Sequence, residues 1–379
     1  MSFPKLDISR AKPKKILFAA GGTGGHLFPA QALAELIQRQ NHRLHLLFAG
    51  AGLSQSAYFD RSKFSFREIQ SSSFFCGKWL QRFRSIGGLL KGVLQSIKLL
   101  TQESPDLIIG FGSHHAFPIL CAAVFKRIPL VLFESNAIPG KVIRLFSKSA
   151  LFTAIHFPET VRYLKGKTVA VDIPSLKLRN TTSPREARRH FQLDSERFTL
   201  LVFGGSQGAK GINQHLIELI PRLVRKGVDF QLIHLTGNDE TTAETQALCR
   251  QYSIPSYIRK FETQMDLAWS AADLALCRAG AATLSELIYF ETPGLLIPYP
   301  YAADQHQLKN AQFVAKTIGG VRVFYEKSFA LEELEKAISD CALPQSVERE
   351  AMKKSLHDLK LKQVKSDLVA LILDHLGGG

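Results

Sequence analysis

Features that would place the chain across a membrane or outside the cell are missing from the sequence. No run of apolar residues approaches the roughly 18 needed to span a bilayer, so any membrane contact is expected to be peripheral. The N-terminal stretch MSFPKLDISRAKPKK has no apolar h-region, so no signal peptide is expected. The 5 cysteines are odd in number and include no Cys-x-x-Cys pair. This argues against a disulfide framework or a zinc site and fits a reducing compartment.

Acidic residues are scarce in the first half of the chain. Residues 1–150 contain 20 Lys and Arg but only 7 Asp and Glu, a net charge of +13, whereas residues 151–379 contain 28 and 26, a net charge of +2. A uniformly basic chain would favour nucleic acid as the partner. The uneven distribution indicates one basic face that meets an anionic surface, and charge alone leaves acidic lipid, a phosphorylated substrate and nucleic acid open.

Internal repeats and low-complexity tracts are also absent, which favours a globular organisation. At 379 residues the chain is too long for one ordinary core and suits two domains. Short apolar runs alternate with helical patterns, as is typical of parallel sheets covered on both faces. The sequence therefore predicts two similar α/β domains in tandem. The predicted strands are 16–20, 44–48, 107–110, 129–133 and 151–155, then, after a polar stretch at 172–189, 199–203, 229–235, 273–276 and 294–297.

A glycine-rich loop, Gly21-Gly22-Thr23-Gly24-Gly25-His26, follows the first predicted strand and precedes a helical pattern from about Pro29. Glycines there let backbone N–H groups approach a phosphate at a helix N-terminus. A turn without a ligand is the simpler alternative, but it needs fewer glycines. The spacing is not Gly-x-Gly-x-x-Gly, and residues 49–53 offer no acidic residue to a ribose, which argues against a nicotinamide enzyme. His26 closes the loop and is the predicted general base.

A second loop of the same kind, Gly204-Gly205-Ser206-Gln207-Gly208-Ala209, follows the strand predicted at 199–203. The Ser206 hydroxyl can donate a hydrogen bond to a phosphate oxygen, and Asn213 lies about one helical turn further on. We expect Ser206, Gln207 and Asn213 to bind substrate.

The segment from Cys277 to Ala311 carries side chains that suit a sugar nucleotide. A small-residue turn at 279–283 precedes a helix with Glu286 one turn in, where a carboxylate can accept both hydroxyls of a ribose. Amide and carboxylate groups near strand C-termini are typical of a sugar site. A later loop supplies Asp304, Gln305, His306, Gln307 and Asn310.

Five segments match a known pattern, in order along nearly the whole chain: GGTGGHLFPA at 21–30, FESNAIPG at 133–140, GGSQGAKGIN at 204–213, CRAGAATLSE at 277–286 and DQHQLKNA at 304–311. Together they resemble the MurG family, the UDP-N-acetylglucosamine:lipid I transferases of peptidoglycan synthesis. The resemblance implies the α/β GT-B fold, in which two Rossmann-like domains with parallel sheets face a deep cleft. It also implies an inverting hexosyltransferase that uses no metal and no cofactor, and the sequence contains no Asp-x-Asp motif.

The resemblance also implies roles for individual residues. Thr23, Gly24, Gly25 and His26 are expected near the diphosphates and the acceptor, and Asn136 on the donor sugar. Glu262, after Phe261, is expected to meet uracil through its backbone, and Gln307 to bind the sugar hydroxyls. The nucleoside is expected to lie on a stretch made of Ala281, Ala282, Thr283, Leu284, Ser285 and Glu286.

Two departures from the family pattern concern acceptor and phosphate binding. The family's Gly-Gly-Tyr loop is replaced by Gly110-Phe111-Gly112-Ser113-His114-His115. The family's Asn-Pro-x-Arg junction is replaced by Ile173-Pro174-Ser175-Leu176, which leaves Lys177 and Arg179 as candidates for the missing arginine.

The predicted function is transfer of N-acetylglucosamine from UDP-GlcNAc to the C4 hydroxyl of MurNAc in undecaprenyl-diphosphate-linked MurNAc-pentapeptide (lipid I), forming lipid II. The alternatives are transfer to another lipid such as diacylglycerol, a UDP-sugar epimerase, a dinucleotide-dependent oxidoreductase and a non-catalytic nucleotide- or lipid-binding module. The expected partners are UDP-GlcNAc, the lipid-linked acceptor, the anionic inner-membrane surface and proteins of cell-wall synthesis or division, with no nucleic acid. The expected location is the cytoplasmic face of the inner membrane.

The predicted domains are residues 1–175 for the acceptor and membrane, 176–355 for the UDP-sugar, and a helix at 356–379 that packs back on the first domain. Residues 78–98 form a basic amphipathic segment, because no acidic residue lies between Glu68 and Glu103 and apolar residues recur at steps of three and four. A break is predicted at Gly87-Gly88. The second half, with Leu89, Leu90, Val93, Leu94 and Ile97, is predicted to be core. The first half is predicted to dock on the membrane through Trp79, Leu80, Arg82, Phe83 and Arg84.

Overall fold

The computed structural model describes residues 13–71, 79–174, 182–205, 209–302, 305–362 and 365–377, without the side chains of 79–86, 318 and 362. The chain forms two compact units: unit 1 is Met1–Glu134, Pro139–Pro174 and Lys365–Gly379, and unit 2 is Ser135–Ile138 and Ser175–Val364. Unit 1 therefore ends one residue before the predicted boundary. The chain returns to it at Lys365 rather than at 356, because helix α12 (Val347–Lys362) still belongs to unit 2.

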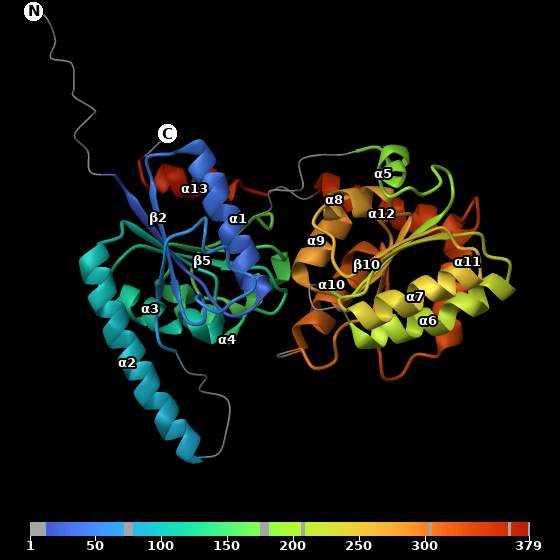
Figure 1. The fold of residues 1–379 in the computed structure, drawn as a ribbon. Coiled ribbons are helices and arrows are strands. Elements are labelled where there is room, and N and C mark those ends of the chain that lie inside the picture. Colours follow the sequence, from blue (N-terminus) through green and yellow to red (C-terminus); the bar gives the residue numbers. More distant parts are fainter. Residues whose placement is uncertain are drawn as a thin grey trace, which may run out of the picture. The chain divides into compact units, whose positions relative to one another are not determined.

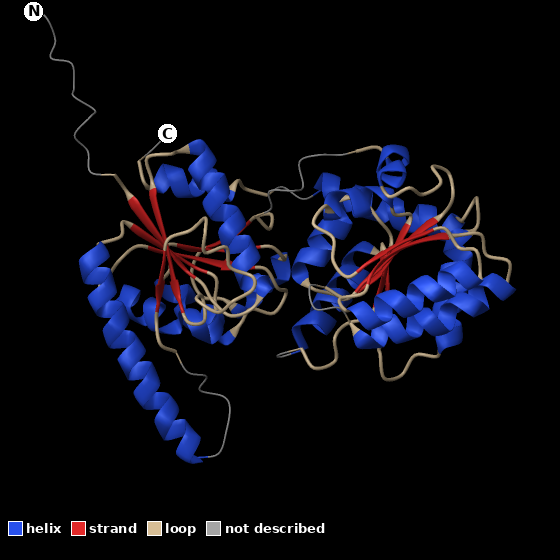
Figure 2. Cartoon of the chain, viewed as in Figure 1, coloured by secondary structure: helices blue, strands red, loops and turns tan. Residues whose placement is uncertain are grey.

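Unit 1 is built on a seven-stranded parallel sheet with the order β3-β2-β1-β4-β5-β6-β7. Its central strands are continuous apolar runs because helices cover both faces (Figure 2). The strands are β1 (Lys15–Ala19), β2 (His45–Gly50), β3 (Phe66–Glu68), β4 (Leu107–Gly110), β5 (Leu130–Glu134), β6 (Phe152–Ile155) and β7 (Thr168–Ala170). The helices are α1 (Gly24–Gln40), α2 (Trp79–Glu103), α3 (Ser113–Phe125), α4 (Lys141–Phe146) and α13 (Leu368–His375), with 3-10 turns at Ser147–Ser149 and Pro158–Tyr163.

Unit 2 repeats the plan with a six-stranded parallel sheet in the order β10-β9-β8-β11-β12-β13. The strands are β8 (Thr199–Phe203), β9 (Gln231–Leu235), β10 (Ser256–Arg259), β11 (Leu274–Cys277), β12 (Gly294–Leu296) and β13 (Val321–Val323). The helices besides α12 are α5 (Pro184–His190), α6 (Lys210–Arg225), α7 (Asp239–Gln251), α8 (Met265–Ala271), α9 (Ala281–Tyr289), α10 (His306–Ile318) and α11 (Leu331–Ala342). The prediction of two parallel-sheet, Rossmann-like domains is confirmed.

Helix α6 illustrates how the sequence pattern fixes packing in unit 2. Leu216, Leu219, Ile220 and Leu223 recur at steps of three and four and are fully buried. They join apolar side chains of β8, β9 and β11 in one core cluster. A stripe of this width on one face of a helix is the usual way in which a helix covers a sheet.

The C-terminal segment of the chain completes unit 1. Ser366 forms a parallel bridge with Val171, and the Lys365 ammonium lies 2.7 Å from the Asp172 carboxylate. Asp367 then caps α13 by accepting a hydrogen bond of 2.8 Å from the Val369 N–H. Helix α13 packs against α1, where the red and dark blue helices meet in Figure 1.

Helix α2 differs from its prediction in two ways. It runs without a break through Gly87-Gly88. Leu90 and Leu94, predicted to be core, are 62% and 67% exposed, whereas Leu89 is 4% exposed. The predicted membrane residues lie in the first turns of the helix, and their side chains lie outside the described residues. In the part of the chain that the structure describes, no helix is long and apolar enough to cross a membrane.

Helix α1 begins earlier than predicted. Its first residue is Gly24, with Thr23 as the N-cap, so Pro29 lies in the second turn rather than the first. Pro29 cannot donate to the carbonyl of Gly25, four residues earlier. His26 is consequently a residue of the first helical turn.

Candidate active site

Both glycine-rich loops follow the strand at which the order of the sheet reverses. β1 pairs with β2 on one side and β4 on the other, and β8 pairs in the same way with β9 and β11. In open α/β sheets, ligands bind outside the carboxyl ends of the strands at this reversal. The topology thus puts each loop where a ligand is expected. Ser206 and Gln207 of the second loop lie outside the described residues.

The loop after β1 is tightly packed at its first two glycines. A Cβ atom on Gly21 would come within 2.6 Å of the Ala51 carbonyl oxygen and 2.8 Å of the His115 Cβ, and Gly22 has a φ of +85°. Both positions therefore require glycine. The loop continues into α1, where the His26 N–H donates to the Thr23 carbonyl at 3.1 Å and the N–H groups of Gly24 and Gly25 precede the first intrahelical bonds. Thr23, Gly24, Gly25 and His26 therefore surround a helix N-terminus suited to an anion.

His115 joins this loop to two others. Its ring lies against Gly22, its backbone carbonyl accepts a 3.2 Å hydrogen bond from the Ala51 N–H in the loop after β2, and it belongs to the segment after β4. The Ser113 hydroxyl lies 2.8 Å from the His115 Nδ1, and Ser113 adopts a left-handed φ of +67°. Ser113 and His115, which lie where the family has its Gly-Gly-Tyr loop, thus hold the first glycine loop in place: His115 contacts it, and Ser113 contacts the His115 ring.

Burial lowers the pKa of His115 to about 4, with further contributions from the nearby His114 and His26. Burial also lowers the pKa of His114. The carboxylate of Glu68 opposes the shift of His115 but is outweighed. At neutral pH the His115 imidazole is therefore uncharged and acts as a packing and hydrogen-bonding group.

The shifted pKa of His115 predicts a loss of stability in mild acid. Between pH 6.5 and about 4 the unfolded chain binds a proton that the folded chain excludes, so the free energy of unfolding falls as the pH falls through this range. His115→Asn is expected to lose less stability between pH 7 and 5.5 than the wild type, measured by urea unfolding at each pH. Parallel stability curves for the two proteins would contradict the assignment.

In unit 2, Glu286 occupies the first turns of α9, after the strand β11. Its Oε2 accepts a 2.8 Å hydrogen bond from the indole N–H of Trp269. Of the residues predicted to hold the nucleoside, Leu284 is fully buried and Ala281 and Ser285 are 8% and 7% exposed. Only Ala282, Thr283 and Glu286 present side chains that are not buried. Ala281, Leu284 and Ser285 therefore offer a ligand little side-chain surface.

Arg278, to which the sequence analysis assigned no role, lies at the C-terminal end of β11. Its guanidinium binds the Glu326 carboxylate through two hydrogen bonds of 2.8 and 3.1 Å and donates another of 3.0 Å to the Ile297 carbonyl. A Cβ atom on Gly211, in the first turn of α6, would collide with the Glu326 carboxylate. The ion pair therefore ties the end of β11 to the segments that follow β12 and β13, and the Glu326 carboxylate lies close against Gly211 at the start of α6. A lone arginine after a strand gave no signal for this role in the sequence.

Asn310 links α10 to the segment that contains Asn136. It is fully buried, and its amide donates to the Asn136 Oδ1 at 3.2 Å while its own Oδ1 accepts from the Ala137 N–H at 2.9 Å. Gln307, one helical turn earlier on α10, accepts a 3.0 Å hydrogen bond from the Tyr299 N–H. Asn136 is thus held beside α10, although it lies far earlier in the sequence.

The side chain of Glu262 points into the protein. Its carboxylate accepts hydrogen bonds from the Tyr257 hydroxyl at 2.6 Å and the Gln264 N–H at 2.7 Å. Burial alone would raise the pKa of Glu262, but these hydrogen bonds outweigh it and hold the pKa below its usual range. Only the backbone of Glu262 is therefore available to contact a base.

The side chain of Asn213 is buried in unit 2, where it forms hydrogen bonds with other residues of the same unit. It is 3% exposed, its amide donates to the Thr236 carbonyl at 2.9 Å, and the His234 Nε2 lies 3.1 Å from its Oδ1. Because an amide oxygen only accepts, the His234 Nε2 carries the proton. The predicted role in substrate binding is replaced by a structural one, in which Asn213 fastens the start of α6 to β9.

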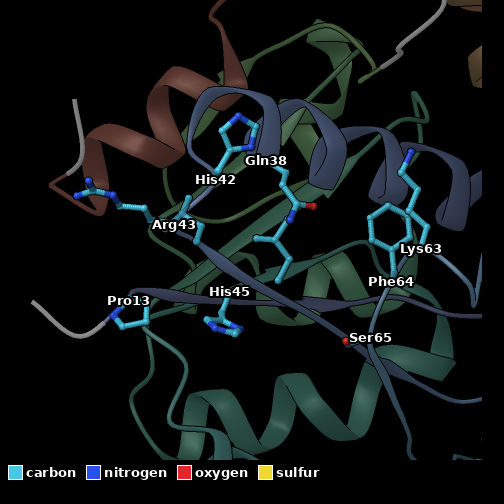
Figure 3. A pocket seen from close by; sticks show the side chains of 10 residues that line it. Pro13, Gln38, His42, Arg43, His45, Lys63, Phe64 and Ser65 are labelled. Atoms are coloured by element: carbon cyan, nitrogen blue, oxygen red, sulfur yellow. The ribbon is translucent and has the colours of Figure 1, made fainter.

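A cavity of about 810 Å³ lies near the N-terminal ends of β1, β2 and β3 in unit 1, whereas the glycine loop follows the C-terminal end of β1 (Figure 3). It is bordered by the end of α1 and the start of β2. Its cations are exposed, and Lys63 is paired with Glu35 at 2.7 Å. The cavity is therefore separate from the candidate site. The lining residues are Pro13, Gln38, His42, Arg43, Leu44, His45, Leu46, Lys63, Phe64 and Ser65.

Known proteins resemble this chain over almost its full length. Residues 16–155 match the glycosyltransferase family 28 N-terminal domain, and residues 199–368 match the family 28 C-terminal domain. The crystal structure of Acinetobacter baumannii MurG superposes with a TM-score of 0.73 at 23% identity, covering 96% of this chain and 98% of that one, which shows a common fold.

Two relatives carry the name UDP-N-acetylglucosamine--N-acetylmuramyl-(pentapeptide) pyrophosphoryl-undecaprenol N-acetylglucosamine transferase. The protein from Protochlamydia amoebophila (strain UWE25) is 38% identical over 367 residues, covering 95% of this chain and 96% of its own. The protein from Chlamydia felis (strain Fe/C-56) is 32% identical over 327 residues, covering 86% of this chain and 89% of its own. At this identity over nearly the whole of both chains, the chain belongs to the MurG family within glycosyltransferase family 28.

Proposed function

We propose that this chain is the N-acetylglucosaminyltransferase that converts lipid I to lipid II. It transfers N-acetylglucosamine from UDP-GlcNAc to the C4 hydroxyl of MurNAc in the undecaprenyl-diphosphate-linked MurNAc-pentapeptide. The names of the two relatives support this activity. The structural observation that supports it is the placement of Glu286 and Gln307, the two side chains proposed to bind the ribose and the donor sugar, on helices α9 and α10 in unit 2.

Inversion at the anomeric carbon requires in-line attack by the acceptor hydroxyl. In our proposal His26, in the first turn of α1, takes the proton from that hydroxyl. The departing UDP carries the developing negative charge on its diphosphate. The loop at 204–209 and the N-terminus of α6 stabilise this charge, with Ser206 donating to a phosphate oxygen. Glu286 holds the ribose, and Gln307 with Asn136 holds the donor sugar.

The test of the activity is UDP release from UDP-GlcNAc in the presence of lipid I. We expect release to depend on lipid I and to fall sharply when UDP-glucose replaces UDP-GlcNAc or diacylglycerol replaces lipid I. Release without any acceptor, together with formation of an epimerised sugar, would instead support an epimerase. Binding of UDP-GlcNAc without turnover would support a non-catalytic module.

We further propose that unit 1 docks on an anionic membrane through helix α2. Leu90 and Leu94 are exposed on this helix, and an ideal helix turns by about 100° per residue. Positions 79, 83, 90 and 94 therefore fall within about 60° of one another. The exposed Lys91 and Lys98 lie on the same helix, and each cation near an anionic leaflet contributes about 1 kcal/mol. Apolar and basic side chains on one helix are the usual composition of an interfacial anchor.

Replacing Trp79 and Phe83, or Leu90 and Leu94, with serine is expected to reduce liposome binding and activity on long-chain acceptor in bilayers. Activity on a short-chain, soluble acceptor is expected to persist, because the reaction itself does not use these side chains. The matched control is Leu89→Ser on the same helix, which removes a 4% exposed side chain and should lower the melting temperature instead. Equal losses on both acceptors with a lowered melting temperature in the paired variants would mean that they are core.

A further inference from the structure

Trp269 is a fully buried side chain with a single polar atom. It lies on α8, is 1% exposed and is among the largest side chains of the core. Its ring meets Phe203 edge-on, with centroids 5.5 Å apart and an interplanar angle of 89°. It is also stacked with Phe290, the residue that follows α9, with centroids 6.5 Å apart and an interplanar angle of 6°. Two aromatic contacts of defined geometry fix the plane of the indole.

The one polar atom of this ring is aimed at Glu286. The indole N–H donates to Oε2 at 2.8 Å, a charge-assisted hydrogen bond from a group that cannot rotate away. A glutamate side chain on a helix surface otherwise samples several rotamers, and ordering it on ligand binding costs free energy. The buried indole therefore orders this carboxylate before any ligand arrives.

Trp269 also contacts the strand that leads into the second glycine loop. Phe203 is the last residue of β8, and Gly204-Gly205 follow it directly. Gly205 has a φ of +99°, so the chain turns sharply there. One side chain thus fixes both the carboxylate on α9 and the strand end before the loop.

We infer that Trp269 is a positioning residue that holds the Glu286 carboxylate in the orientation needed to accept the ribose hydroxyls, and that it thereby sets the preference for ribose over deoxyribose in the uridine nucleotide. The inference rests on the proposed function, in which Glu286 binds the ribose of the donor. A site built to hydrogen bond a hydroxyl discriminates strongly against the analogue that lacks it. That discrimination depends on the carboxylate being held in place.

The test compares UDP with 2′-deoxy-UDP by titration calorimetry on the full chain. The wild type is expected to bind UDP at least about tenfold more tightly than 2′-deoxy-UDP. Trp269→Phe keeps an aromatic ring but removes the N–H donor, and its preference is expected to fall toward unity. The matched control Phe290→Leu removes the stacking partner but keeps the donor, the burial and the Phe203 contact that hold the indole, and its preference is expected to stay close to that of the wild type.

Two outcomes would overturn the inference. One is an unchanged preference in Trp269→Phe. The other is an equal loss of preference in both variants with equally lowered melting temperatures, which is the pattern of a purely structural ring. A wild type that fails to bind UDP would instead refute the proposed function, so the two failures are distinguishable.

A measurement on the unmodified protein keeps the test independent of variant folding. The sequence has 2 tryptophans, Trp79 and Trp269, so an amide-correlation NMR spectrum contains two indole N–H signals, which a Trp79→Phe variant assigns. Saturating UDP is expected to shift the Trp269 signal, because the ribose hydroxyls bind the same carboxylate, and 2′-deoxy-UDP is expected to shift it less. A Trp269 signal that does not move at saturating UDP would also overturn the inference.

Discussion

Replacing His26 with alanine is expected to lower kcat about 100- to 10,000-fold while leaving the Kd for UDP-GlcNAc nearly unchanged. His26 lies in the first turn of α1 in unit 1, whereas the groups proposed to bind the donor lie in unit 2. Loss of a general base removes an interaction that matters in the transition state and not in donor binding. Steady-state kinetics with lipid I and calorimetry with UDP-GlcNAc measure the two quantities separately.

The control for this variant is His42→Ala. His42 is exposed and lies near the N-terminal ends of the strands of the same sheet, beside the cavity of Figure 3, so its removal is expected to leave kcat unchanged. A His26→Ala enzyme with unchanged kcat and a raised KM for the donor would reassign His26 to binding.

Replacing Glu286 with alanine is expected to weaken UDP binding by roughly 2–4 kcal/mol, or about 30- to 700-fold in Kd. The carboxylate is proposed to accept two ribose hydroxyls, and it is held by the Trp269 indole at 2.8 Å. Alanine would also leave that buried N–H without its acceptor, so a lowered melting temperature is expected as well. Calorimetry with UDP and thermal unfolding measure the two effects.

Glu286→Gln separates these two effects. Its side-chain oxygen can still accept the indole hydrogen bond, but the charge that strengthens bonds to the ribose is gone. The melting temperature is expected to stay near that of the wild type while UDP binding weakens. Normal binding of UDP by both variants would show that Glu286 does not hold the ribose.

The strands that the sequence predicted are those at the centre of each sheet. β1, β4 and β5 in unit 1 and β8 and β11 in unit 2 are buried on both faces and therefore appear as continuous apolar runs. The four strands that were missed are β3, β7, β10 and β13, which are the two edges of each sheet. They are three or four residues long and partly exposed, so neither their length nor their composition distinguishes them from loops.

The candidate site was predictable where its chemistry is local in sequence. Glycines next to a strand end and a glutamate one turn into a helix are short-range signals, so the sequence predicts both loops and Glu286 as binding groups. No local pattern in the sequence indicates a role for Trp269, because its proposed role depends on a hydrogen bond between two helices, 17 residues apart. Asn213 was misassigned for the related reason that its partner His234 lies on a neighbouring strand. Leu90 and Leu94 were taken for core because periodicity identifies an apolar face but not what covers it.

The return of the chain to unit 1 at Lys365 has a consequence for biosynthesis. A ribosome delivers residues 175–364, and thus all but four residues of unit 2, before it delivers α13 and the segment that pairs with Val171. Domains usually mature from the N-terminus during translation. Here the first unit to emerge lacks the helix that packs on α1 until residues 175–364 have been synthesised, so unit 1 cannot complete its fold before that point.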